Sequence, residues 1–171
     1  MGGEYWEQGA KMIGPDIARK AIAAALKAGA SYADVRMVSE RGEAIAMKNG
    51  VVEALTSSAD EGLGIRVIAE GAWGFAATHS KDPKEIEETA RLAVRIARAS
   101  ARIGHEPVKL SEVEPARAVW KSDFKIDPFD VPLEEKVKLL KEVDRIVRRS
   151  PKVRVSMGRM VFMQEEKWFV S

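Results

Sequence analysis

The 171 residues are enough for a single domain that folds around its own core, and the absence of cysteine removes disulfide frameworks and thiolate metal sites. Twenty-eight Lys and Arg residues against 26 Asp and Glu residues give a net charge of +2, which provides no electrostatic basis for nucleic-acid binding. No apolar run reaches the roughly 20 residues that span a bilayer, and the N-terminus lacks a signal-peptide pattern, so we expect a soluble cytoplasmic protein without a membrane partner.

The sequence predicts a helix near the N-terminus, followed by strands. Residues 1–14 form an extension that the pattern assigns to no element. A helix is indicated by Pro15 where a first helical residue belongs, Gly29 where a helix stops, and a stripe of alanines between them. Apolar residues then alternate with polar ones over 33–38 and again over 43–48, which is typical of strands.

Turn residues predict two hairpins. Asn49 and Gly50 give the clearer signal, because a type I′ turn requires positive φ at both central positions and these residues tolerate it. The returning strand is followed by a loop and then by a second hairpin over 61–78. We expect a three-residue loop in this second hairpin, with Gly71 in the left-handed position, because a two-residue loop would place Glu70 at a positive φ.

The three-residue loop sorts the second hairpin into two faces. Val67 then lies opposite Trp73 and Ile65 lies opposite Phe75, so one face is wholly apolar. We expect both aromatic residues in the core, and the less favoured alternative is a binding platform. The other face carries small residues around one cation, which allows a helix or another backbone to approach closely. The residues of this second face are Gly64, Arg66, Gly74, Ala76 and Thr78.

Arg66 and the glycines beside it are the candidate contact residues for a peptide or a partner protein. An arginine among glycines on a strand is able to offer its planar guanidinium group to a carboxylate. The alternative, which the sequence favours, is an ordinary surface ion pair, for example with Glu53 or Glu70. Gly64 and Gly74 complete the candidate contact set, and no residue is assigned a catalytic or metal-binding role.

Two further helices are predicted. Asp82 is a capping residue, Pro83 suits the first helical position, and the alanine-rich stripe that follows runs to about Ser100. This stripe could lie on the small residues of the second hairpin. Pro132 opens the other helix, which runs to about Arg149. Its apolar residues, expected to point inward, are Val137, Leu140, Val143 and Val147.

Together these elements predict an α+β fold. We expect an antiparallel sheet of about five consecutive strands with two or three packed helices, because consecutive strands with short connections pair antiparallel. A helix, the sheet and a second helix occupy residues 15–121, with a possible edge strand at 116–120. Residues 122–171 add a helix-strand-strand unit to the same domain, with two or three short strands. Because the sequence stops at an apolar strand, we expect a fragment of a longer protein.

The strands and hairpins resemble the N-terminal part of a known family. The matching stretches are Ser31-Tyr32-Ala33-Asp34-Val35-Arg36, Lys48-Asn49-Gly50-Val51-Val52-Glu53, and Gly62-x-Gly64-Ile65-Arg66-Val67 with Gly71-x-Trp73-Gly74-Phe75-Ala76. In order and spacing they are similar to the TldD/PmbA family of metallopeptidases, formerly described as modulators of DNA gyrase. The resemblance covers roughly residues 15–171, which would be the front part of a family member.

The resemblance implies a function for the complete protein. It would hydrolyse peptides with a zinc-activated water, and it would form a homo-oligomer or a hetero-oligomer with a related chain. The family's zinc motif is a helical H-E-x-x-x-H with a further ligand from a late Cys, and this sequence has neither. Its two histidines, His79 and His105, lack converging ligands. We therefore expect zinc in the missing C-terminal part, while this portion supplies scaffold, a substrate-holding wall or subunit contacts.

A second class of function stays open, namely a stand-alone peptide- or protein-binding module without catalytic activity. A hydrolytic site within the chain is not expected. His79, Ser80 and Asp82 have the residue types of a triad, but neighbours along the chain rarely point at one another, so a loop and a helix cap are favoured. The high share of charged residues with few side-chain amides also indicates a thermophilic source.

Overall fold

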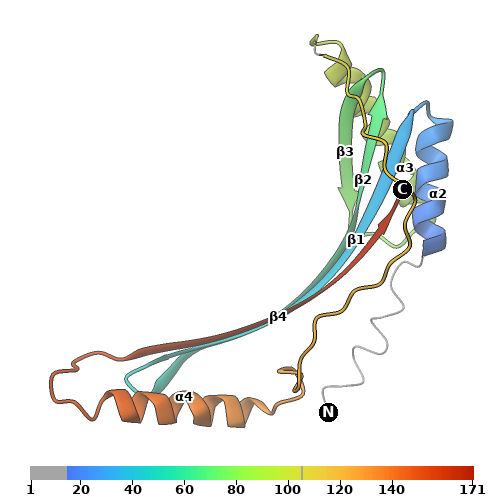
Figure 1. Ribbon diagram of the computed structural model, residues 1–171. Helices are drawn as coiled ribbons and strands as arrows, with labels where there is room; N and C mark the ends of the chain where they lie inside the picture. The colour runs from blue at the N-terminus through green and yellow to red at the C-terminus, as the bar shows by residue number, and fades with distance from the viewer. Residues whose placement is uncertain (1–14, 105) are drawn as a thin grey trace. The chain divides into compact units, whose positions relative to one another are not determined.

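The computed structural model describes residues 15–104 and 106–171 (Figure 1). The elements are α2 (Pro15–Lys27), β1 (Tyr32–Lys48), β2 (Val51–Ala69), β3 (Ala72–Thr78), α3 (Pro83–Ala101), α4 (Leu133–Val147) and β4 (Met157–Val170). The strands form one antiparallel sheet in the order β3-β2-β1-β4, which confirms the predicted α+β class. The N-terminal extension over 1–14 and His105 lie outside the described residues.

The strands are longer and fewer than the sequence predicted. β1 joins the two strands expected at 33–38 and 43–48, and β2 continues through the loop expected at 58–61. β4 is a single strand where two or three were expected. Polar residues at the expected break in β1 make contacts between strands, since Arg41 Nε donates to Gln164 Oε1 of β4 at 2.5 Å. These polar residues therefore do not end the strand, because side chains of a neighbouring strand hydrogen-bond to them.

The described residues divide into two compact units that alternate along the chain. The first unit contains residues 40–60 and 119–165, and the second contains 15–39, 61–118 and 166–171. Strands β1, β2 and β4 contribute residues to both units. The domain boundaries expected from the sequence stay a prediction.

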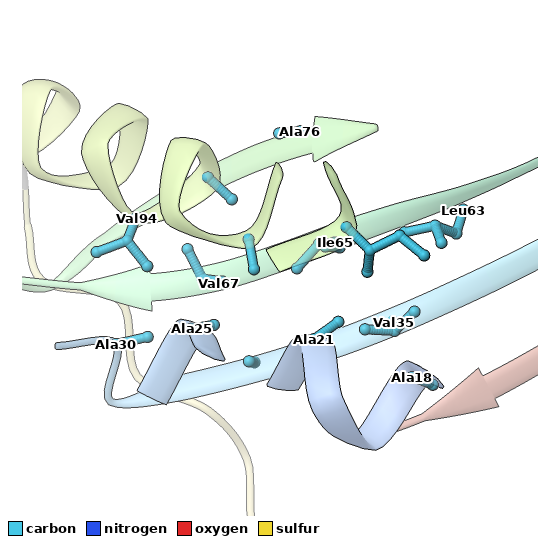
Figure 2. Packing of buried hydrophobic residues seen from close by; sticks show 14 of the residues in the cluster. Ala18, Ala21, Ala25, Ala30, Val35, Leu63, Ile65, Val67, Ala76 and Val94 are labelled. Atoms are coloured by element: carbon cyan, nitrogen blue, oxygen red, sulfur yellow. The ribbon is translucent and has the colours of Figure 1, made fainter. Parts of the chain in front are cut away.

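The core of the second unit is built from the sheet and helices α2 and α3 (Figure 2). Both helices contribute alanines, whose small side chains let helices and strands approach closely. The strands contribute larger side chains such as Ile65 and Val67, which have no exposed surface. At the start of α3 the Asp82 carboxylate accepts a hydrogen bond from the Lys84 N–H at 3.0 Å, and Pro83 follows the cap. The predicted cap is therefore confirmed.

The register of the β2–β3 hairpin differs from the prediction. A two-residue turn joins the strands, with Glu70 at φ 53° and Gly71 at φ 77°. The paired residues are Leu63–Thr78, Gly64–Ala77, Ile65–Ala76, Arg66–Phe75, Val67–Gly74, Ile68–Trp73 and Ala69–Ala72. The expected three-residue loop is therefore wrong. The positive φ at Glu70 costs free energy. In return, the short turn lets every residue from Leu63 to Ala69 pair with β3, and it turns the side chains of Ile65, Val67 and Ala76 toward the core.

The observed register places Gly74 and Phe75 on opposite faces of the sheet. A Cβ atom at Gly74 would lie 2.1 Å from the Ala93 carbonyl oxygen and 2.6 Å from the Ala97 nitrogen, so α3 packs directly on this glycine. The predicted close approach of a helix at Gly74 is confirmed. Phe75 points away from α3 and is 59% exposed, and the half-buried Trp73 lies on the same face of β3, so the predicted place of both rings in the core is wrong.

In the first unit, α4 packs against the sheet. The core there consists of Ile45, Met47 and Leu140, with Val52, Val137 and Met160 partly buried around them. The predicted inward positions are correct for Val137 and Leu140, whereas Val143 and Val147 are 49% and 45% exposed. Lys136, in contrast, is buried, and its Nζ lies 2.8 Å from Glu43 Oε1. A paired charge therefore occupies an inward position that apolarity alone does not predict.

The predicted turn at Asn49 and Gly50 is confirmed, with φ values of 50° and 80°. Asn49 Oδ1 accepts from the Ser156 N–H at 3.0 Å, and the Asn49 N–H donates to the Ser156 carbonyl oxygen at 2.9 Å. The turn is thereby fixed to the segment that leads into β4.

The connection between α3 and α4 is irregular. The edge strand expected at 116–120 is wrong, because these residues have no regular structure and Val119 and Trp120 are almost fully exposed. Within the described ranges, no helix has the length and apolarity needed to cross a membrane.

Candidate functional site

The candidate site is the face of the sheet that points away from α2 and α3 in the second unit. Among the side chains that alternation along the strands brings to it are five that we call the Arg66 face: Tyr32 and Asp34 of β1, Arg66 of β2, and Trp73 and Phe75 of β3. Their neighbours along each strand point into the core. The sheet thus has an apolar packing surface on one side and the aromatic and charged side chains of the Arg66 face on the other.

The centre of the Arg66 face is an ion pair between Arg66 and Asp34. Arg66 Nη2 and Nε lie 2.7 Å and 2.9 Å from Asp34 Oδ2. The Asp34 side chain is only 1% exposed, whereas that of Arg66 is 41% exposed. The hydrogen bond to Asp34 raises the pKa of Arg66 above its ordinary value, so this guanidinium group is always charged. The favoured reading of Arg66 as half of an ion pair is correct, although its partner is neither Glu53 nor Glu70.

Aromatic rings restrain the ion pair from the side. The Arg66 guanidinium carbon lies 4.6 Å from the centre of the Trp73 ring, within the range of a cation–π interaction. Tyr32 meets the same ring edge-on, with 6.1 Å between the ring centres. Burial raises the pKa of the Tyr32 hydroxyl, and the charge and hydrogen bond of Asp34 raise it further. Arg66 is therefore held in one orientation while part of its surface stays accessible.

Phe75 forms the outer part of the Arg66 face, and Gly64 lies beneath its ring. A Cβ atom at Gly64 would lie 2.8 Å from Phe75 Cε2, which shows that the phenylalanine ring lies over the glycine. The absence of a side chain at Gly64 thus sets the position of an exposed ring beside Arg66. Of the three residues expected to contact a peptide or partner, Gly64 and Arg66 share this face, whereas Gly74 lies on the opposite face beneath α3.

The sequence did not identify Tyr32 and Asp34 as members of the site. Both lie in the stretch that carries the family resemblance, but their role depends on a contact between residues 32 positions apart. Asp34 occupies a polar position in the alternation of apolar and polar residues over 33–38, so the strand pattern gave no signal that its carboxylate is buried and paired.

The described residues do not form a metal centre. Among them, no group of three or more His, Asp or Glu side chains converges in the way that a metal ion requires. His79 is exposed. Close to it, Ser80 Oγ accepts from the Asp82 N–H at 3.1 Å and Asp82 caps α3, as the loop-and-cap interpretation predicted. The residues that the structure describes therefore do not fit a zinc site.

The chain is similar to a family model and to two curated metalloproteases. Residues 33–97 match the family model described as PmbA/TldA metallopeptidase domain 1. A metalloprotease from Methanocaldococcus jannaschii is 28% identical over 109 residues, which cover 64% of this chain and 24% of that protein. A metalloprotease from Methanothermobacter thermautotrophicus is 31% identical over 116 residues, which cover 65% of this chain and 23% of that protein. The matched part thus spans about a quarter of the length of these relatives.

Solved structures share the fold at low sequence identity. A protein from Thermotoga maritima named as a modulator of DNA gyrase matches with a TM-score of 0.64 and 15% identity over 91% of this chain and 35% of its own. TldE from Thermococcus kodakarensis matches with a TM-score of 0.61 and 16% identity over 90% of this chain and 34% of its own. These findings confirm the resemblance predicted from the sequence: residues 33–97 match the model of the first PmbA/TldA metallopeptidase domain, and the chain is similar to part of the length of the proteins named above.

Proposed function

We propose that this chain is the N-terminal, non-catalytic portion of a TldD/PmbA-like zinc metallopeptidase and that it holds the peptide substrate. The observation that carries the substrate-holding role is the Arg66 face, where an accessible arginine is fixed by a buried aspartate beside an exposed phenylalanine. In this proposal the zinc ion and its ligands belong to residues beyond this sequence. The complete protein would hydrolyse peptides, and it would associate with an identical or related chain.

The position of β3 supports a peptide-binding role. β3 is an edge strand of the sheet (Figure 1). Its side chains Trp73 and Phe75 belong to the Arg66 face. An edge strand is able to accept an extended peptide through main-chain hydrogen bonds, which requires little sequence specificity. The peptide would then run along the aromatic side chains of β3, and a carboxylate at its end or on a side chain would pair with Arg66.

A binding assay with matched peptides tests this proposal. We would measure the fluorescence anisotropy of a labelled unstructured peptide that ends in a free carboxylate, and compare it with the same peptide ending in an amide. The acid should bind better, and Arg66→Gln should remove that preference. The expected loss is about tenfold or more, because a hydrogen bond to a charged group contributes about 1.5–3 kcal/mol.

Arg91→Gln is the matched control, because Arg91 is similarly exposed and pairs with Glu87 on the surface of α3. It should leave binding unchanged. Equal affinity for the acid and the amide in the unchanged protein, or an equal loss in both variants, would contradict a specific role of Arg66.

The second candidate is a stand-alone peptide- or protein-binding module without catalytic activity. The Arg66 face favours it as much as it favours the first, because neither function requires a metal within this chain. The two candidates differ in the rest of the protein, so the native mass and zinc content distinguish them.

A further inference from the structure

A second arginine, Arg36, lies on the same side of the sheet as the Arg66 face. Arg36 follows Asp34 by two residues in β1, so alternation along the strand turns both side chains to this side. Val35 and Met37, which occupy the alternate positions, are buried in the core. Asp34 is buried against Arg66, whereas Arg36 is exposed. All of these residues belong to the second unit, so two neighbouring strands bring two guanidinium groups to one surface.

An aromatic ring of β4 supports Arg36. The guanidinium carbon of Arg36 lies 5.5 Å from the centre of the Phe169 ring, within the range of a cation–π interaction. Phe169 is 55% exposed, and Val170 beside it packs against the core, so the ring lies on the same side of the sheet as Arg36. Arg66 is supported in the same way by Trp73. Each arginine thus rests against an aromatic ring of the adjacent strand.

The two arginines differ in their charge balance. Asp34 accepts hydrogen bonds from Nε and Nη2 of Arg66, so this pair has no net charge, and part of the guanidinium group stays accessible to a ligand. Among the residues that the structure describes, no carboxylate forms an ion pair with Arg36. Arg36 therefore adds an uncompensated positive charge to a surface whose other ion pair is neutral.

We propose that Arg36 binds the side-chain carboxylate of a peptide whose last residue is acidic, while Arg66 binds the terminal carboxylate of that residue. The inference rests on the proposed function, in which a peptide pairs with β3 and its terminal carboxylate meets Arg66. In the sheet order β1 lies beyond β2 as seen from β3, so the last side chain of such a peptide points toward β1. Arg66 reaches Asp34, and Arg36 begins about 7 Å further along β1. Both arginines are therefore placed to contact one terminal residue.

Four peptides test the proposal by fluorescence anisotropy at low ionic strength. They are identical except that the last residue is Glu or Gln, and each is prepared as the free acid and as the amide. Among the free acids, the peptide ending in Glu should bind about fivefold more tightly than the one ending in Gln, as expected of a well-placed exposed ion pair. Arg36→Gln should remove the preference for Glu and keep the preference for the free acid over the amide. Arg66→Gln should remove the preference for the free acid.

Arg95→Gln is the matched control, because it removes the same charge from an exposed position on α3, which packs on the other side of the sheet. It should leave the preference for Glu unchanged. Arg36→Lys should retain part of that preference, because the ammonium group keeps the charge but lacks the planar fork of the guanidinium group. In the unchanged protein, salt at about 1 M should abolish the preference for Glu, because the Debye length then falls to about 3 Å. Circular dichroism would verify that every variant is folded.

Equal binding of the free acids ending in Glu and Gln would overturn the proposal, and so would a preference for Glu that survives Arg36→Gln. Loss of that preference in Arg95→Gln as well would indicate a general effect of charge and would also overturn it. In each of these cases a preference for the free acid over the amide would leave the proposed function standing. Absence of the preference for the free acid would contradict the proposed function itself, so the two failures are separate outcomes.

Discussion

Replacing Gly74 by alanine tests how closely α3 packs on β3. The new Cβ atom would lie 2.1 Å from the Ala93 oxygen and 2.6 Å from the Ala97 nitrogen, both of which belong to the helix backbone. Since ordinary contacts between carbon atoms begin near 3.5 Å, α3 would have to move by more than about 1 Å. Overpacking of this kind costs about 1–3 kcal/mol, and we expect the upper end of the range because no side chain can rotate away.

The assay is urea unfolding followed by far-ultraviolet circular dichroism, with Gly64→Ala as the matched control. At Gly64 the added Cβ would meet only the ring of Phe75, which is 59% exposed and free to turn. Alanine also stabilises the folded protein by about 0.5–1 kcal/mol relative to glycine, because the unfolded chain loses less conformational entropy on folding. We expect a change within about 1 kcal/mol for Gly64→Ala. Equal stabilities of the two variants, or a stable Gly74→Ala, would refute the close-packing interpretation.

Three further outcomes follow from the polar contacts. Arg66→Leu should lower the free energy of unfolding by about 1–3 kcal/mol more than Asp34→Leu does. Arg66→Leu leaves the buried carboxylate of Asp34 without a cation, whereas Asp34→Leu leaves a guanidinium group that is partly hydrated. Urea unfolding of both variants checks this order. The pKa of Tyr32 is higher in the folded than in the unfolded protein. The contribution of Tyr32 to stability is therefore complete at pH values below the unfolded-state pKa near 10 and is lost as the pH rises through the folded-state pKa. Between about pH 9 and 11, the free energy of unfolding should decline less steeply with pH in Tyr32→Phe than in the unchanged protein. Glu43→Gln should be more destabilising than Lys136→Met, because it leaves the buried ammonium group of Lys136 unpaired, and thermal unfolding should give Glu43→Gln the lower midpoint.

Features with a local cause could be predicted from the sequence. The turn at Asn49 and Gly50 depends on two adjacent residues that tolerate positive φ, and the start of α3 depends on Asp82 and the proline after it. The number of strands could not be predicted, because polar residues such as Arg41 are satisfied by residues far along the chain.

The candidate site shows the same limit. A positive φ at Glu70 is unfavourable locally, so the sequence indicated the longer loop, but packing of α3 on Gly74 requires the register that the short turn provides. That shift moved Phe75 from the core to the exposed face. Arg66 was identified because it is unusual among glycines, whereas its partner Asp34 depends on the pairing of β1 with β2.

The most direct test of the proposed function is the intact mass and zinc content of the native protein isolated from its source. We expect a mass well above 18.8 kDa and about one zinc ion per chain, as in a catalytic site whose ligands lie beyond this sequence. A native mass that equals these 171 residues, with no bound zinc, would contradict the metallopeptidase and leave the stand-alone binding module.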